Sequence, residues 1–314
     1  MERILCTAYG DSDADRGITI ITEKDSSYSL DYIKVPGKCN FCIEYKDVLY
    51  VPVQTEKNLI MEFKKKEDTY VLDGTYEVKH FYSHGTIYHD QLILASFSDG
   101  VDAVYDRNTH KESDVSVHNR KIYKCHGRSH YAGITPDEKY VFTVDNGFQQ
   151  IYLYKAENGK LQMISTKDFP DENIRLMPYS AYSERFYLNT ERTNRIYVLD
   201  YANGTFHIQD VENMDNKDSC FSGANSISED GKRLCASLRG EDTLYYYRIQ
   251  KDGSLQLLTK KQCGSMPRDV LFRKNRLYVA CTDQNVIEVY KTDNDQLEKI
   301  SEIPVNKPVT FACI

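Results

Sequence analysis

One pattern recurs along this chain: a short apolar strand, a polar turn of about five residues, and a second strand in which apolar and polar residues alternate. Six copies start 43 to 48 residues apart, at Leu49, Leu92, Tyr140, Phe186, Leu234 and Leu277. A seventh copy starts near Ile4, 45 residues before the first of these, as ILCTAYG followed by GITIIT. Hairpins that recur at this period indicate the blades of a β-propeller.

The segments between the hairpins, and the two ends of the chain, complete this interpretation. Each repeat holds a strand-like stretch after its hairpin, such as LQLLTK, and a short one before the next hairpin, such as PRDVLF. The tail KPVTFACI looks like an inner strand that lacks a hairpin, and the N-terminus is a hairpin that lacks an inner strand. A ring of blades leaves open sheet edges unless these two segments share a blade. We therefore predict an all-β fold, with residues 1–314 forming one seven-bladed β-propeller domain of four antiparallel strands per blade.

Composition limits the class of partner. The formal charge of −7 disfavours nucleic acid and anionic lipid, because binding to phosphate backbones depends on an excess of Lys and Arg. No stretch approaches 18 uncharged apolar residues, so we expect no membrane span. The N-terminus has no apolar signal segment, and the nine cysteines are scattered and odd in number. We expect a cytoplasmic protein without a disulfide framework.

Three short motifs invite a functional interpretation that the sequence does not support. Cys39 and Cys42 form a CxxC, but no second pair follows at zinc spacing, so we interpret both as structural residues. The charged run FKKKED from Phe63 is typical of a solvated hairpin end. The two histidines of HGRSH fall on one face of a strand without defining a metal site. We predict neither a metal nor a cofactor.

The third and fourth repeats resemble the lactonase-type propeller family, which includes 6-phosphogluconolactonase and the carboxy-muconate lactonizing enzyme. In the third repeat, SHYAGITPDEKYVFTVDNG matches the family's His-bearing inner strand, Pro-Asp-Gly turn and Asp-Leu-Gly strand end, and His130 stands at the family's His. In the fourth, NIRLMPYSAYSERFYLNTER aligns without a gap and places Arg175 and Glu191 on the family's Arg and Glu. The resemblance implies the propeller fold and a site at the mouth of its central channel.

The fifth and sixth repeats extend the resemblance over nearly the whole chain. SEDGKRLCASLRGEDTL matches the family's Ser-Pro-Asp-Gly turn and supplies Arg239, and MPRDVLF matches a Pro-Arg-Asp inner strand with Arg268. Three positions depart from the family pattern, because Leu176 replaces a His and Thr190 and Leu238 each replace an Asn. These departures leave open a substrate other than the family's best-known one.

The resemblance implies that the protein is a lactone hydrolase similar to 6-phosphogluconolactonase, acting in carbohydrate metabolism on a small anionic lactone or organic acid. Arginine can hold a carboxylate or phosphate bidentately, while a carboxylate or imidazole activates water. Either Glu191 or His130 is the candidate base. The predicted catalytic residues are His130, Arg175, Glu191 and Arg239, and the predicted substrate-binding residues are His84 and Arg268.

Two alternatives remain open. A lactonizing isomerase of the muconate type would use much the same side chains to move a proton. A propeller without catalytic activity could bind a metabolite or a protein at its channel mouth, because a fold does not determine a function. A WD-type scaffold is disfavoured, because its repeat depends on a Trp-Asp pair and the chain has no Trp.

Overall fold

The computed structural model describes residues 2–10, 12, 16–24, 27–67, 69–119, 125–170, 172–214 and 219–313. The chain divides into two compact units. Unit 1 comprises residues 1–168 and 309–314, and unit 2 comprises residues 169–308. Over the described residues the strands form seven antiparallel sheets of four strands each. This is the number of sheets that the repeat pattern predicts.

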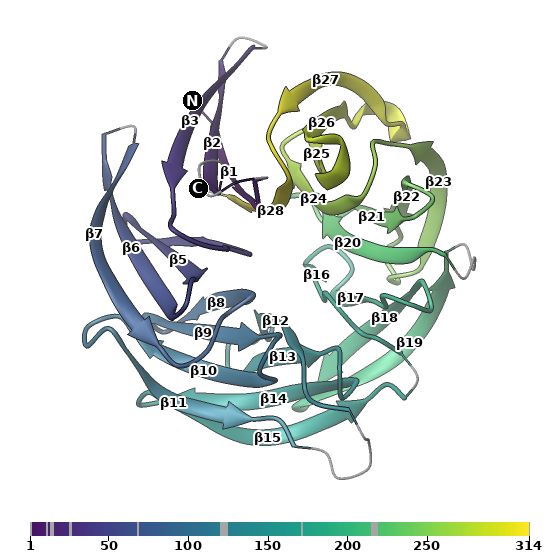
Figure 1. Ribbon diagram of the computed structural model, residues 1–314. Helices are drawn as coiled ribbons and strands as arrows, with labels where there is room; N and C mark the ends of the chain where they lie inside the picture. Colours follow the sequence, from purple (N-terminus) through teal and green to yellow (C-terminus); the bar gives the residue numbers. More distant parts are fainter. Residues whose placement is uncertain are drawn as a thin grey trace. The chain divides into compact units, whose positions relative to one another are not determined.

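Unit 1 contains four of these sheets (Figure 1). The first has the order β28-β1-β2-β3, with β28 (Pro308–Cys313), β1 (Glu2–Ala8), β2 (Gly17–Lys24) and β3 (Ser27–Lys34). The second contains β4 (Ile43–Tyr45), β5 (Val48–Gln54), β6 (Asn58–Lys66) and β7 (Thr69–Val78). The third contains β8 (His84–Tyr88), β9 (Gln91–Ser96), β10 (Val101–Asp106) and β11 (Lys111–Val117). The fourth contains β12 (Ser129–Ile134), β13 (Val141–Asp145), β14 (Gln150–Glu157) and β15 (Lys160–Asp168).

Unit 2 contains the remaining three sheets of the described chain. The first contains β16 (Tyr179–Ser180), β17 (Arg185–Asn189), β18 (Arg195–Ala202) and β19 (Thr205–Asn213). The next contains β20 (Phe221–Ile227), β21 (Arg233–Arg239), β22 (Thr243–Ile249) and β23 (Leu255–Gln262). The last contains β24 (Pro267–Arg273), β25 (Arg276–Cys281), β26 (Val286–Lys291) and β27 (Glu298–Pro304), with short 3-10 turns at η1 (Thr282–Gln284) and η2 (Asp293–Asp295).

The two middle strands of each sheet are the hairpins that the sequence predicts. The interior residues of β5, VLYVPVQ, are all buried, because both faces of this strand are covered. In the outer strand β15, KLQMISTKD, every residue is exposed or only partly buried. A strand covered on both faces loses its polar alternation, so these segments stand out in the sequence as apolar runs.

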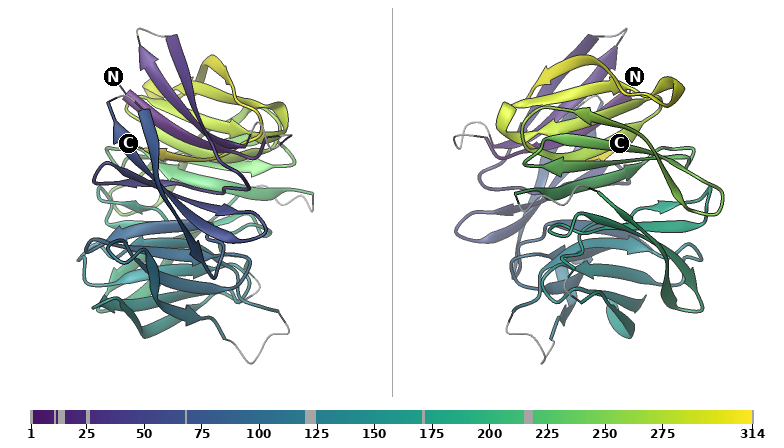
Figure 2. Two further views of the ribbon diagram at one scale, coloured as in Figure 1. Left: turned by 60° about the vertical axis from the view of Figure 1, so that its left-hand side comes forward. Right: turned by 90° about the vertical axis from the view of Figure 1, so that its right-hand side faces the viewer.

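The predicted pairing of the two ends is confirmed. β28 lies beside β1 and completes the first sheet, as the views in Figures 1 and 2 show. Thr7 Oγ1 donates a hydrogen bond to the carbonyl oxygen of Thr310 at 3.3 Å, and Ala312 packs against the core of this part of unit 1. The first sheet is therefore assembled from residues at opposite ends of the chain.

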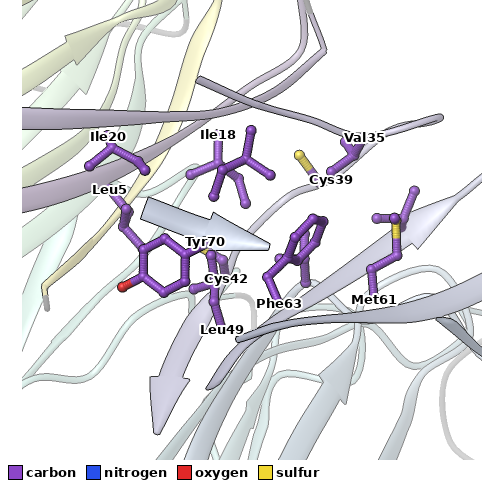
Figure 3. Packing of buried hydrophobic residues seen from close by; sticks show 13 residues of the cluster. Leu5, Ile18, Ile20, Val35, Cys39, Cys42, Leu49, Met61, Phe63 and Tyr70 are labelled. Atoms are coloured by element: carbon purple, nitrogen blue, oxygen red, sulfur yellow. The ribbon is translucent and has the colours of Figure 1, made fainter. Parts of the chain in front are cut away.

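The structural interpretation of the CxxC is confirmed as well. Cys39 and Cys42 lie in a buried apolar cluster with Leu5, Ile18 and Phe63 (Figure 3). Burial raises the pKa of the Cys39 thiol to about 12 and that of Cys42 well above its ordinary value. Both thiols are therefore neutral near pH 7, and a neutral buried thiol acts as a small apolar side chain.

Candidate functional site

A carboxylate that lies against two arginines marks the candidate site in unit 2. Glu191 follows the end of β17, and its Oε1 atom accepts a hydrogen bond from Arg239 Nη2 at 2.6 Å. Arg175 Nη1 lies 3.8 Å from the same oxygen. Three residues that the sequence predicts to act together therefore meet at one atom.

Main-chain carbonyl groups of β20 hold both guanidinium groups in place. Arg239, the last residue of β21, donates from Nη2 to the Ser222 carbonyl at 2.8 Å and from Nε to the Phe221 carbonyl at 3.4 Å. Arg175 donates from Nε to the Gly223 carbonyl at 2.6 Å. Because these acceptors belong to a strand, the positions of the two arginines are set by backbone atoms rather than by mobile side chains.

The sequence analysis missed the amide side chain that supports this arrangement. Asn189 is buried at the end of β17; its Nδ2 donates to Ser222 Oγ at 2.8 Å and its Oδ1 accepts from the Leu176 N–H at 2.9 Å. The Glu191 main chain is fixed on both sides, because its N–H donates to the Asn173 carbonyl at 2.7 Å and its carbonyl accepts from the Ser222 N–H at 2.9 Å. The family pattern has an Asn where this chain has Thr190. The only sequence signal for Asn189 was therefore an Asn that stands one residue earlier than the pattern requires.

The cluster carries an excess of positive charge. Burial lowers the pKa of Arg175 to about 9; the charges of Arg239 and Arg268 also lower it, and those of Glu191 and Asp269 oppose the shift. Arg175 is still protonated near pH 7, so Arg175 and Arg239 bring two positive charges to the one carboxylate of Glu191. Such a cluster favours a ligand that brings a carboxylate or phosphate.

Solvent reaches the carboxylate more easily than the arginines. The Glu191 side chain retains 24% of its accessible surface, against 9% for Arg175 and 10% for Arg239. Glu191 is therefore the most exposed of the three side chains, and the two guanidinium groups stabilise the negative charge of its carboxylate. Arg268 lies in β24 and acts on Arg175 through its charge.

The two predicted histidines belong to unit 1. His84 begins β8; its Nδ1 accepts a hydrogen bond from the Ala132 N–H at 3.2 Å, and its ring packs against Tyr131 with centroids 4.4 Å apart. Burial lowers the pKa of His84 to about 4, so the ring is neutral near pH 7 and serves as an acceptor in the packing of β8 on β12. His130, in β12, meets the Phe97 ring edge-on at 5.4 Å. Their membership of the same site as Glu191 stays a prediction.

The sequence analysis also missed a second buried polar cluster, which is formed by His118, Asp102 and Asp145 next to the start of β12. His118 Nε2 lies 2.6 Å from Asp102 Oδ2, and its Nδ1 lies 2.5 Å from Asp145 Oδ2. Asp145 also accepts from the Arg128 N–H at 2.9 Å, and Ser129 Oγ donates to Asp102 at 2.6 Å. The cluster therefore fixes the chain immediately before His130. Its residues are dispersed in the sequence, and only Asp145 falls in a family motif, as the Asp of the third repeat's Asp-Leu-Gly strand end.

Gly223 leaves no room for a side chain at the centre of the unit 2 site. A Cβ atom on it would lie 2.4 Å from Ser237 Oγ and 2.5 Å from the Pro267 carbonyl oxygen. We expect Gly223→Ala to push β20 away from β24, to lower stability by about 1–3 kcal/mol, and to loosen the carbonyl that holds Arg175. Thermal unfolding measures the loss.

Ser222→Ala is the matched control, because it removes a hydroxyl from the neighbouring residue without adding bulk. The hydroxyl accepts one hydrogen bond from Asn189, so we expect a loss of about 0.5–1.5 kcal/mol. If Gly223→Ala melts at the same temperature as the wild type, β20 and β24 can move apart without loss of stability, and the expected clash is absent.

Two further findings on the described residues concern a metal site and a membrane-spanning helix. Among the residues that the structure describes, no group of three or more His, Cys, Asp or Glu side chains is arranged to hold a metal ion. In the same residues, no helix is long and apolar enough to cross a membrane.

Comparisons with known proteins agree with this architecture. Residues 13–313 match the family described as "Lactonase, 7-bladed beta-propeller". An uncharacterized protein of Staphylococcus saprophyticus is 30% identical over 175 residues, which are 52% of this chain and 50% of that protein. The 6-phosphogluconolactonase of Bacillus subtilis is 24% identical over 176 residues, 54% of this chain and 50% of the enzyme. The matches thus span about half the length of these curated relatives.

A solved structure supports the fold over the full length. A Bacteroides fragilis protein, provisionally named a 6-phosphogluconolactonase, has a TM-score of 0.89 at 21% identity and covers 100% of this chain and 98% of its own. This similarity and the seven four-stranded sheets of the described residues confirm the predicted fold class. The chain belongs to the lactonase family of seven-bladed β-propellers.

Proposed function

We propose that this protein hydrolyses a lactone that carries a negative charge, with 6-phosphoglucono-δ-lactone as the first candidate substrate. The observation that supports this most directly is the placement of Glu191 against two buried arginines, with positive charge in excess. Membership of the lactonase family and the partial match to the Bacillus subtilis enzyme point to the same reaction class.

The proposed chemistry uses side chains alone. Glu191 takes a proton from a water molecule, whose oxygen attacks the lactone carbonyl carbon. A guanidinium group stabilises the negative charge that develops on the carbonyl oxygen. The ring C–O bond then breaks, and the leaving alkoxide takes up the proton from Glu191 to give a hydroxyl group and a carboxylic acid, which releases its remaining proton to solvent as a carboxylate. Excess positive charge at the cluster binds the phosphate or carboxylate of the substrate.

The test is the hydrolysis of freshly prepared 6-phosphoglucono-δ-lactone by the purified protein, corrected for spontaneous ring opening. We expect Glu191→Gln and Arg239→Ala each to lower kcat/KM by about 10²-fold or more, because each removes a group that acts in the transition state. Arg248→Ala is the control, since Arg248 pairs with Asp295 instead and should leave the rate unchanged. His130→Ala reports whether the imidazole is the base.

The result that contradicts the assignment is full activity in both Glu191→Gln and His130→Ala. Absence of turnover above the spontaneous rate in the wild type would exclude this sugar phosphate as the substrate.

A different lactone, or a binding role, is the second candidate, and it has a specific observation in its favour. Leu238 is fully buried in an apolar cluster of unit 2, and Leu176 packs against another. Thr190 is buried with its hydroxyl 2.7 Å from that of Thr193. The three positions that depart from the family pattern are therefore engaged in packing rather than in presenting the family's polar groups. Calorimetric measurement of the binding of unphosphorylated organic-acid lactones distinguishes this candidate from the hydrolysis of 6-phosphoglucono-δ-lactone.

A further inference from the structure

The outer strand β3 differs from the outer strands of the other six sheets of the described chain. In each of those six, one extra residue interrupts the pairing with the neighbouring strand: Asp73 in β7, Ser113 in β11, Ile164 in β15, Gln209 in β19, Leu258 in β23 and Ile300 in β27. β3 pairs with β2 over eight consecutive residues without a shift. β3 is therefore the one regular outer edge among the described strands.

A regular outer edge has a physical consequence. A bulge bends and twists an edge strand, which hinders another strand from pairing with it. β3 ends the order β28-β1-β2-β3, so no strand of its own sheet covers its outer edge. Its outward N–H and C=O groups can pair with a further strand.

One face of β3 carries three consecutive apolar or aromatic side chains, followed by Lys34 at the end of the strand. Tyr28, Leu30 and Tyr32 alternate along the strand; Leu30 retains 41% of its accessible surface and Tyr32 retains 45%. Tyr32 lies over Gly17, where a Cβ atom would come within 2.8 Å of the ring. The sheet thus holds one side of the ring in place. Residue 33, on the opposite face, is the buried Ile of this strand.

We propose that β3 pairs antiparallel with β3 of a second copy of this chain, about a two-fold axis that passes between the two Leu30 residues. A two-fold axis perpendicular to a sheet keeps the two faces of the sheet distinct. Two residues that face each other across the axis must then have their side chains on the same face of the sheet. This requirement allows only those pairings in which the axis passes between two copies of the same residue.

Side-chain pairing selects Leu30 as that centre. In this register Leu30 faces its counterpart, Tyr28 faces the partner's Tyr32, and Ser29 faces the partner's Asp31. Apolar and aromatic cross-strand pairs stabilise a sheet, and a hydroxyl group can donate to a facing carboxylate. The register centred on Asp31 would instead oppose two like charges, which is destabilising. The Leu30 register therefore brings Tyr28, Leu30 and Tyr32 of both copies together without a charge conflict.

The expected dimer is reversible. A stable protein interface buries about 1,000 Å² or more, and two paired strands bury less than this. The dissociation constant of the dimer should therefore lie in the micromolar range or above. The proposal does not depend on the proposed lactone hydrolysis, because β3 lies outside the residues assigned to that reaction.

Sedimentation equilibrium of the full chain, from about 1 µM to about 500 µM, tests the proposal. We expect the wild type to pass from monomer to dimer, and Leu30→Lys to raise the dissociation constant at least about tenfold, because it places two like charges at the axis. Leu72→Lys is the matched control: Leu72 is 51% exposed on the outer strand β7, directly before the extra residue Asp73. It should leave the dimer intact.

Charge variants test the register itself. Tyr28→Lys and Tyr32→Glu should each weaken self-association, and an equimolar mixture of the two should form a heterodimer, because the new lysine of one chain faces the new glutamate of the other. A wild type that stays monomeric throughout the range overturns the proposal, as does a dimer that Leu30→Lys leaves unchanged. A mixture that associates no better than its components overturns the Leu30-centred pairing.

Discussion

A chain that ends at Pro308 should lose most of its stability, because β1 then has no inner neighbour. β28 supplies the inner edge of the first sheet, and Leu5 and Cys6 of β1 are fully buried there. Each buried backbone group left without a partner costs about 1–3 kcal/mol, and several would be exposed at once. The total approaches the whole stability of an ordinary domain, about 5–15 kcal/mol. Urea unfolding and solubility measure the loss.

Two controls separate the loss of the strand from the loss of a side chain. Thr310→Val keeps the backbone of β28 in place, so we expect a change below about 1 kcal/mol. A synthetic peptide of residues 306–314, added to the truncated chain, should restore part of the stability by pairing with β1. An unchanged melting temperature in the truncated chain would show that β28 is dispensable.

Replacement of His118 by Phe should destabilise unit 1 by about 3–5 kcal/mol, because it leaves the buried carboxylates of Asp102 and Asp145 without their cation. The Phe ring can still stack on Tyr152, whose ring lies 3.9 Å from that of His118, so the change removes the charge and the hydrogen bonds rather than the packing. Tyr154 and Thr143 donate to Asp102 and remain in the variant.

The loss should depend on pH in a defined direction. Burial acts to lower the pKa of His118, but the charges and hydrogen bonds of Asp102 and Asp145 outweigh it and raise that pKa from 6.5 to about 9. A group whose pKa is raised on folding stabilises the folded state fully below its unfolded pKa, and this contribution disappears as the pH rises through the folded value. The difference in unfolding free energy between wild type and His118→Phe should therefore be large at pH 6 and shrink from about pH 6.5 to about pH 9.

Denaturant unfolding of both proteins across this range provides the measurement. A His207→Phe variant is the control for the replacement of a histidine by phenylalanine, since His207 is exposed in the outer strand β19. A difference between wild type and His118→Phe that stays constant from pH 6 to pH 9 would mean that His118 is not held as a cation.

The middle strands of each sheet could be predicted from the sequence because their environment is encoded locally. Segments such as LYVPVQ and LILAS are apolar over consecutive residues, since both faces of the strand are buried, and a polar turn follows each of them. The repeat of this unit set the number of sheets. The incomplete first and last repeats were enough to predict the pairing of β28 with β1.

The arginines and the carboxylate of the candidate site could be predicted from the family pattern, but their geometry could not. Arg239 and Glu191 are 48 residues apart and meet only because consecutive sheets place the end of β21 beside the turn after β17. The supporting groups, such as the Gly223 carbonyl, are backbone atoms that carry no signal in a side-chain pattern.

The sequence by itself determined the all-β repeat, the strands that are buried on both faces and the segments that join the two ends, because burial of a strand leaves a local and periodic record in its residues. Only the tertiary structure decided the His118 cluster, whose members are 16 and 27 residues apart, and the bulges that distinguish six outer strands from β3. Contacts of this kind depend on which strands come together and in what register. Single polar residues and single inserted residues leave no periodic trace along the chain.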